Sequence, residues 1–180
     1  MIDVGFVGFE KRKKVIDIFR HMVNKFSKEE IMINKISAEN ISNENVDFKK
    51  YNIIIFEADF FERQSNKIIN FANLSPNSIL VVNYDDKSFL KIVRGEIFKL
   101  ITYGFNNKSC ITASSVQDGE EYLCCIQRSF CNFLGKAVEP HEIRVIIKKY
   151  RIKNIYTILI LISAILMCGI DCISEDKIIL

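Results

Sequence analysis

The chain has 180 residues, of which 49% are hydrophobic, and this content is sufficient for the core of one compact domain. Its formal net charge of +3 is too small to predict a nucleic-acid partner, and the basic residues at 11–14 carry no nucleic-acid-binding motif. Six cysteines, mostly inside apolar segments and without a CxxC pair, together with only two histidines, favour reduced buried thiols over disulfides or a zinc site. The basic run follows the first apolar residues, the reverse of a signal peptide, so we expect a cytoplasmic protein.

The first half of the chain alternates apolar strands with helical or polar segments. Apolar residues recur at helical spacing over residues 15–26, and residues 37–52 are polar and predict a loop. Continuous apolar runs of this kind are typical of parallel strands that are covered on both faces. The predicted strands are Ile2–Val7, Ile31–Ile36, Ile53–Phe56 and residues 79–82.

Polar residues and glycines follow these predicted strands, and in an open parallel sheet the segments after the strands share one edge. A glycine turn that opens a helix brings backbone amides close to phosphate, and carboxylates nearby can hold magnesium. The alternative is that these residues only form ordinary turns and caps. The residues concerned are Gly5, Gly8, Glu57, Asp59, Asn83, Asp85 and Asp86.

After residue 83 the pattern changes to a short helix at 88–93 and then to strands with short connections, which predict antiparallel pairing. We therefore expect an α/β fold in a single domain over residues 1–180. A mostly parallel sheet with flanking helices, similar to a P-loop or Rossmann layer, would occupy residues 1–97, and an antiparallel meander closed by an apolar C-terminal helix would occupy residues 98–180. The predicted strands of the meander are residues 98–103, 110–116, 122–127 and 143–147.

The closing helix allows two interpretations. Residues 155–170 contain no charged residue, and a helix of that length spans about 24 Å, which is shorter than the hydrocarbon core of about 30 Å. This length favours a buried helix. The basic residues at 148–153 would equally suit the flank of a membrane anchor, so a tail-anchored protein with a small cytosolic domain is an alternative.

Three segments, in order and at similar spacing, resemble the second half of the central domain of the Mur ligases. They are the Val-Val-Asn-Tyr-Asp-Asp run at 81–86, the Ile-Thr-Tyr-Gly-Phe run at 101–105, and Asn154 with the Gly-Ile-Asp that follows the apolar helix. The resemblance covers residues 80–175. Mur ligases are ATP-dependent enzymes that add amino acids to a UDP-linked peptidoglycan precursor, and the resemblance implies that the apolar helix is buried.

The N-terminal half departs from the phosphate loop of that family. Gly8 is retained, but Lys11 stands at the second glycine, Arg12 at the lysine that reaches the phosphates, and lysines at both hydroxyl positions. The resemblance places Glu57 at the magnesium-binding glutamate. A side chain at position 11 would crowd the phosphates, and no hydroxyl remains for the metal.

The motif before the closing helix is altered as well. Arg151, Lys153 and Thr157 replace its glycine, histidine and second asparagine, whereas Asn154, which contacts adenine in the family, is kept. The chain has no match to the family's N-terminal and C-terminal domains, which position the reacting groups. We therefore do not expect ligase catalysis.

These observations predict a non-catalytic relative of the Mur ligase central domain, a binding or regulatory protein linked to peptidoglycan precursor metabolism. The alternative function is a residual adenine-nucleotide-binding protein or weak ATPase, with ATP and magnesium as remnant ligands. Its candidate site consists of Gly8, Glu57, Asp85 and Asn154. The expected partners are a nucleotide or a UDP-linked cell-wall precursor, with no nucleic acid and no membrane, and no resident cofactor is predicted.

Overall fold

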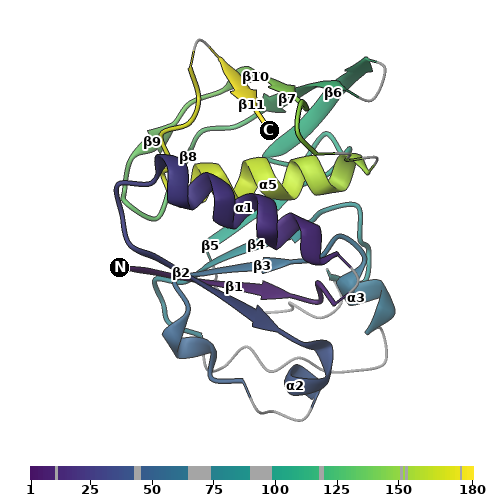
Figure 1. The fold of residues 1–180 in the computed structure, drawn as a ribbon. Coiled ribbons are helices and arrows are strands. Elements are labelled where there is room, and N and C mark those ends of the chain that lie inside the picture. Colours follow the sequence, from purple (N-terminus) through teal and green to yellow (C-terminus); the bar gives the residue numbers. More distant parts are fainter. Residues whose placement is uncertain are drawn as a thin grey trace.

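The computed structural model describes most of the chain and shows an α/β protein built on one large sheet (Figure 1). The described residues are 1–10, 12–42, 46–64, 74–89, 99–117, 120–150, 152, 154–174 and 176–180. The helices are α1 (Lys13–Phe26), α2 (Ala38–Ser42), the 3-10 helix η1 (Phe48–Lys50), α3 (Phe60–Arg63) and α5 (Ile155–Met167). The strands are β1 (Ile2–Val7), β2 (Ile31–Ile36), β3 (Ile53–Phe56), β4 (Ile79–Asn83), β5 (Lys99–Tyr103), β6 (Ile111–Gln117), β7 (Glu121–Ile126), β8 (Phe130–Cys131), β9 (Ala137–Val138), β10 (His141–Ile146) and β11 (Lys177–Ile179).

The large sheet has the strand order β11-β10-β7-β6-β5-β4-β3-β1-β2. Pairing is parallel from β2 through to β6, whereas β7 is antiparallel to both of its neighbours, β6 and β10. The order β2-β1-β3-β4-β5 is that of a doubly wound sheet, in which β1 and β3 flank the point where the strand order reverses. The predicted fold class is confirmed.

The parallel strands are buried on both faces, which explains their continuous apolar sequences. In β3, Ile53 and Ile55 face the core that includes α1 and α5, whereas Ile54 and Phe56 face the core on the side of α2, η1 and α3. Successive side chains of a strand point to opposite faces, so a strand covered on both sides needs apolar residues at every position. Figure 1 shows α1 and α5 on one side of this part of the sheet, α2 on the other, and α3 at the ends of the strands.

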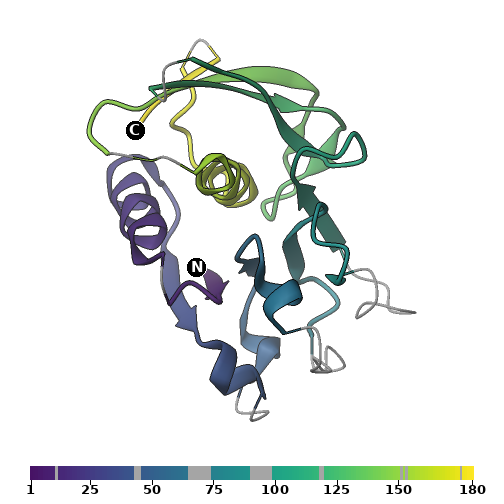
Figure 2. The ribbon, with the colours of Figure 1, turned by 90° about the vertical axis from the view of Figure 1, so that its right-hand side faces the viewer.

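Helix α5 is surrounded by protein, as the interpretation as a buried helix predicts. Every residue from Thr157 to Met167 is buried, and the helix contacts α1, β3, β5 and β6. Figure 2 looks along α5 and shows the sheet curving around it, with α1 beside it. No helix within the described ranges is both long and apolar enough to cross a membrane.

Three predictions about local structure need correction. The segment 37–52 is not only a loop, because it contains α2 and η1, and the buried side chain of Phe48 anchors η1. Strand β5 does not belong to the antiparallel part, since it pairs in parallel with β4 along its whole length. The short connection from β5 to β6 does not reverse the chain, because the two strands are parallel. They share one residue pair, Tyr103 with Ile111, and β6 continues in the same direction as β5.

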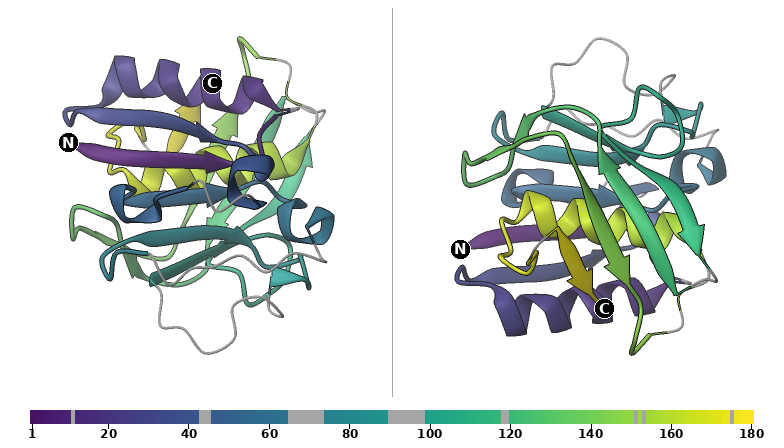
Figure 3. Two further views of the ribbon diagram at one scale, coloured as in Figure 1. Left: turned by 90° about the horizontal axis from the view of Figure 1, so that it is seen from below. Right: turned by 90° about the horizontal axis from the view of Figure 1, so that it is seen from above.

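Some predictions concern residues outside the described ranges, and some elements of the structure were not predicted. The predicted helix at 88–93 lies outside them from residue 90 onward, as does residue 98 of the predicted strand 98–103. The hairpin of β8 and β9 and the final strand β11, which pairs in parallel with β10, were not predicted. Figure 1 shows β10 and β11 above α5 and the parallel strands below it; the right-hand view of Figure 3, from above, shows β10 crossing in front of α5.

The six cysteines are free. The expectation that they are buried holds only for Cys124 and Cys168, since Cys131 is exposed and the other three are half-buried. Burial raises the pKa of the Cys124 thiol to about 12, so this side chain behaves as a small apolar group of the core.

Truncation of a buried leucine of α5 tests how far the protein depends on this helix. We expect Leu161→Ala to lower the free energy of unfolding by about 2 to 5 kcal/mol, because Leu161 is 0% exposed and its loss leaves a cavity. The matched control is Leu134→Ala at a side chain that is 48% exposed, for which we expect a loss below about 1 kcal/mol. Urea denaturation of both variants measures the difference, and equal losses would contradict the central position of α5.

Candidate functional site

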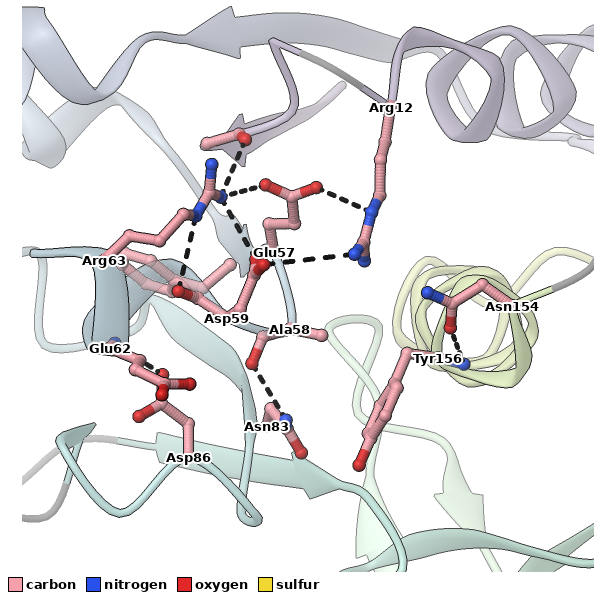
Figure 4. Close-up of polar contacts among 12 residues, drawn as sticks. Arg12, Glu57, Ala58, Asp59, Glu62, Arg63, Asn83, Asp86, Asn154 and Tyr156 are labelled. Carbon is pink, nitrogen blue, oxygen red and sulfur yellow. Dashed lines mark hydrogen bonds and ion pairs between the residues drawn. The ribbon is translucent and has the colours of Figure 1, made fainter.

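The carboxyl ends of β1, β3, β4 and β5 meet the first turn of α5 at one edge of the sheet, and the candidate residues lie there. Figure 4 shows Arg12, Glu57, Asp59 and Arg63 grouped together, with Asn154 and Tyr156 approaching from α5. Gly5 is the exception among the predicted edge residues, because it lies inside β1, paired with Asn34 and Ile54.

Gly8 forms the turn after β1, as expected for a residue that must adopt an unusual backbone conformation. Its φ of +86° is one that L residues rarely adopt, and an added Cβ would lie 2.6 Å from Cδ2 of Phe60. Its amide donates to the carbonyl of Ile36 at 3.1 Å, and its own carbonyl accepts from Nη2 of Arg63 at 3.3 Å. The turn is therefore held by α3 and β2 together.

Glu57 lies at the centre of a cluster of four charged residues and is only 2% exposed. Its Oε1 is 3.0 Å from Nε of Arg12, and its Oε2 contacts Nη2 of Arg63. The same Nη2 is 3.2 Å from Oδ1 of Asp59, so one guanidinium nitrogen faces oxygens of Gly8, Glu57 and Asp59. Both carboxylate oxygens of Glu57 are thus engaged by arginine.

The environment of Glu57 acts on its pKa in opposite directions. Burial raises the pKa above its ordinary value and is the largest effect, while the positive charges of Arg63 and Arg12 lower it. The net result is a raised pKa, because the attraction of two partly exposed guanidinium groups does not fully offset the loss of hydration.

A magnesium ion, which the resemblance implies at Glu57, does not fit the residues present. Mg²⁺ needs free oxygen ligands, but the two Glu57 oxygens contact guanidinium groups and the neighbouring Asp59 faces Arg63 as well. Across the described part of the chain, no group of three or more histidine, cysteine, aspartate or glutamate side chains could hold a metal ion. The cations of this cluster are the two arginines.

Asp85 joins three segments that are far apart in the sequence. Its Oδ2 accepts from the amide of Phe105 at 2.7 Å and from the hydroxyl of Tyr156 at 3.0 Å, and its Oδ1 accepts from the amide of Asn106 at 2.9 Å. Burial and the hydrogen bond to Asp85 raise the pKa of Tyr156 to about 12, and its protonated hydroxyl is the hydrogen-bond donor in this contact. Asp85 therefore ties the ends of β4 and β5 to α5.

Asn154 caps α5. Its Oδ1 accepts from the amide of Tyr156 at 2.9 Å, which satisfies one of the free N–H groups of the first helical turn. The side chain of Asn154 is exposed, and its Oδ1 already accepts the hydrogen bond of this cap.

The four predicted site residues form two linked pairs along the edge. Arg63 joins Gly8 to Glu57, and Tyr156 joins Asp85 to Asn154. A further contact lies between the two pairs. Nδ2 of Asn83 donates to the carbonyl of Ala58, which follows Glu57, at 2.8 Å, and Oδ1 of Asn83 accepts from the amide of Asp85. Figure 4 shows this contact between the two groups.

Sequence reasoning missed Arg63 and Tyr156, although each makes several contacts at this edge. Arg63 lies six positions after Glu57 on a helix of four residues, and so short a helix has no periodic pattern that would predict its direction. Tyr156 stands in an apolar run, and nothing in the sequence distinguishes it from an aromatic residue that only fills the core.

Comparison of the sequence with models of protein families and with curated proteins found no match.

Substitution of Gly104 tests the packing between Asn83 and Asp85. Gly104 has a φ of +141°, and an added Cβ would lie 2.6 Å from Oδ2 of Asp85 and 2.8 Å from Oδ1 of Asn83. We expect Gly104→Ala to destabilise the protein by about 1 to 3 kcal/mol. The control is Gly135→Ala, which also has a positive φ but no atom within 4 Å of the added Cβ, and should cost less in the same thermal denaturation experiment.

The raised pKa of Glu57 predicts how stability changes with pH. The folded chain binds this proton more tightly than the unfolded chain, so the contribution of Glu57 to stability is full below about pH 4.5 and is lost as the pH rises through the raised value. We therefore expect the free energy of unfolding of Glu57→Gln, relative to that of the unmodified protein, to increase as the pH rises above about 4.5.

Urea denaturation at pH values from about 4 to about 7 measures this difference. Glu62→Gln removes an exposed carboxylate from α3 and is the matched control for the loss of one negative charge at this edge. A Glu57→Gln difference that stays constant or changes in the opposite direction would contradict the assigned pKa shift.

Proposed function

We propose that the protein is a non-catalytic relative of the Mur ligase central domain, a binding or regulatory protein linked to peptidoglycan precursor metabolism. The link to peptidoglycan comes from the resemblance of residues 80–175 to that domain. The absence of catalysis is argued from the geometry of the carboxyl edge.

The observation that carries the proposal is the pairing of Glu57 with two arginines. Phosphoryl transfer from ATP requires a metal ion that bridges phosphate oxygens, together with a lysine and backbone amides around the phosphates. In this chain Arg12 stands at the position of that lysine and pairs with Glu57 at 3.0 Å, while Arg63 contacts the other carboxylate oxygen. The groups that would hold metal and phosphate instead neutralise one another.

The other residues of the resemblance have structural contacts that maintain the fold. Asp85 accepts three hydrogen bonds from residues of its own chain, and Asn154 caps α5. Asn83 ends β4, Gly104 follows β5 and Asn154 caps α5, which packs against the same sheet, an arrangement that the resemblance also requires. These contacts support a fold that is retained without the ligase reaction.

A second candidate function is residual binding of an adenine nucleotide without metal. One observation favours it: Nη1 of Arg12 is buried and has no hydrogen-bond partner among the described residues. A phosphate oxygen is a suitable acceptor for such a group, which lies at the start of α1, where the helix dipole favours negative charge.

Thermal denaturation of the full chain with different ligands tests both functions. We expect ATP with magnesium to leave the melting temperature unchanged and a UDP-linked peptidoglycan precursor to raise it, because a ligand that binds only the folded state stabilises it by mass action. At a concentration of one hundred times its Kd, the precursor would add about 2.7 kcal/mol.

Each outcome of this experiment has a distinct meaning. Magnesium-dependent hydrolysis of ATP would overturn the non-catalytic assignment, and the lack of any effect of the precursors would overturn the link to peptidoglycan. Stabilisation by ATP without magnesium that is lost in Arg12→Met, but retained in the control Lys108→Met, would establish the second candidate. Lys108 is exposed, and within the described part of the chain its recorded hydrogen bond is the one that its backbone amide donates to Oδ1 of Asn106 in the turn between β5 and β6.

A further inference from the structure

The large sheet has two edge strands, and they differ in how they are protected against pairing with another chain. At one edge β11 is only three residues long, and so short a strand offers little to pair with. At the other edge β2 has six residues in continuous register with β1, from Ile31 to Ile36. The sequence of β2 contains no proline and a single charge, so this edge has few of the features that prevent edge-to-edge pairing.

The backbone groups on the outer side of β2 are available to a partner strand. Figure 2 shows β2 at the end of the sheet, and no strand within the described ranges pairs with its outer side. The carbonyls of Glu30 and Ile36 accept from amides of β1 and of the turn after it, at 2.8 and 3.1 Å. Because the backbone groups of successive residues point to alternate sides of a strand, those of Ile31, Ile33 and Lys35 point outward.

The side chains along this edge are apolar in the middle of the strand and charged at its two ends. Met32 is 47% exposed, and Ile31 and Ile33 are half-buried. Glu29 precedes the strand, Lys35 lies near its end, and both side chains are exposed. The edge therefore runs from negative charge through apolar side chains to positive charge.

This order of charges is complementary to itself in one direction only. When the strand pairs antiparallel with the same strand of a second copy, the acidic start of each lies beside the basic end of the other. Parallel pairing would instead bring like charges together. Lys28, which precedes the acidic start, has its Nζ 3.4 Å from Oδ2 of Asp171 in its own chain.

We propose that β2 pairs antiparallel with β2 of a second copy of this chain, about a two-fold axis at Met32. In this register Ile31 of each copy exchanges both backbone hydrogen bonds with Ile33 of the other, and Lys35 lies opposite Glu29 of the other copy. Each copy has one such edge, so the pairing closes at a dimer and joins the two sheets into one. The inference does not rest on the proposed function, because it uses no residue of the candidate site.

Sedimentation equilibrium and amide hydrogen exchange of the full chain test the dimer and its location. We expect a species of twice the 20.9 kDa mass of the chain that dissociates on dilution. The outward amides of Ile31, Ile33 and Lys35 should exchange more slowly in the dimer than in the diluted protein, because pairing protects them.

A proline at the edge tests the backbone pairing. Ile33→Pro removes an N–H that points away from β1, so the pairing of β2 with β1 keeps its hydrogen bonds. We expect the Kd of the dimer to rise roughly tenfold or more, because each dimer loses two hydrogen bonds. Ile33→Val keeps this N–H and is the matched control, which should dimerise like the unmodified protein.

Charge reversal tests the direction of pairing. Lys35→Glu and Glu29→Lys should each raise the Kd of the dimer, and the two together should restore it. The matched control is Lys108→Glu, an exposed position in the turn after β5, which lies four strands from β2 in the sheet. This variant should leave the Kd unchanged, and thermal denaturation verifies that every variant is folded.

Four results would overturn the proposal. They are a monomer at every concentration, a dimer whose outward β2 amides exchange freely, a dimer that Ile33→Pro and Lys35→Glu leave unchanged, and association that continues beyond the dimer.

Discussion

The structure depends on covering a helix that is apolar on all sides. Helix α5 has no polar face to present to water, so the chain must bury it on every side. The parallel strands and α1 cover part of its surface, and β6, β7 and β10 extend the sheet so that it curves over the rest (Figure 2). The antiparallel strands can thus be understood as the part of the fold that makes α5 possible in water.

The same helix connects the core to the carboxyl edge of the sheet. Its first turn carries Asn154, which caps it, and Tyr156, whose hydroxyl binds Asp85 between β4 and β5. The position of α5 therefore determines where the loops after β4 and β5 lie. Packing in the interior and the geometry of the candidate site are consequences of one arrangement.

Much of the fold was predictable because its signals are local. Four-residue apolar runs, Ile53–Phe56 and residues 79–82, predicted strands buried on both faces, and the structure confirms them. The direction of β5 was not predictable in this way, because a short connection usually reverses the chain and here it does not. The pairing of β11 with β10 depends on a contact between residues more than thirty positions apart, for which a three-residue strand offers no pattern.

The candidate site was predictable as a location more than as a set of contacts. Glu57 and Asp85 follow apolar strands, and topology alone brings such residues to one edge. The partners of Glu57 were not predictable, because the direction of the Arg63 side chain depends on the placement of α3. The resemblance drew attention to the loss of phosphate-binding residues but gave no indication of what would neutralise Glu57.

Arg63 has a consequence for how this edge of the protein responds to its surroundings. A metal ion bound between Gly8, Glu57 and Asp59 would exchange with solution, and its occupancy would follow the concentration of free ion and of competing chelators. The guanidinium group that faces these oxygens is attached to the chain and cannot dissociate from it. The loops after β1 and β3 are therefore held together by a cation whose occupancy is independent of the magnesium concentration around the protein.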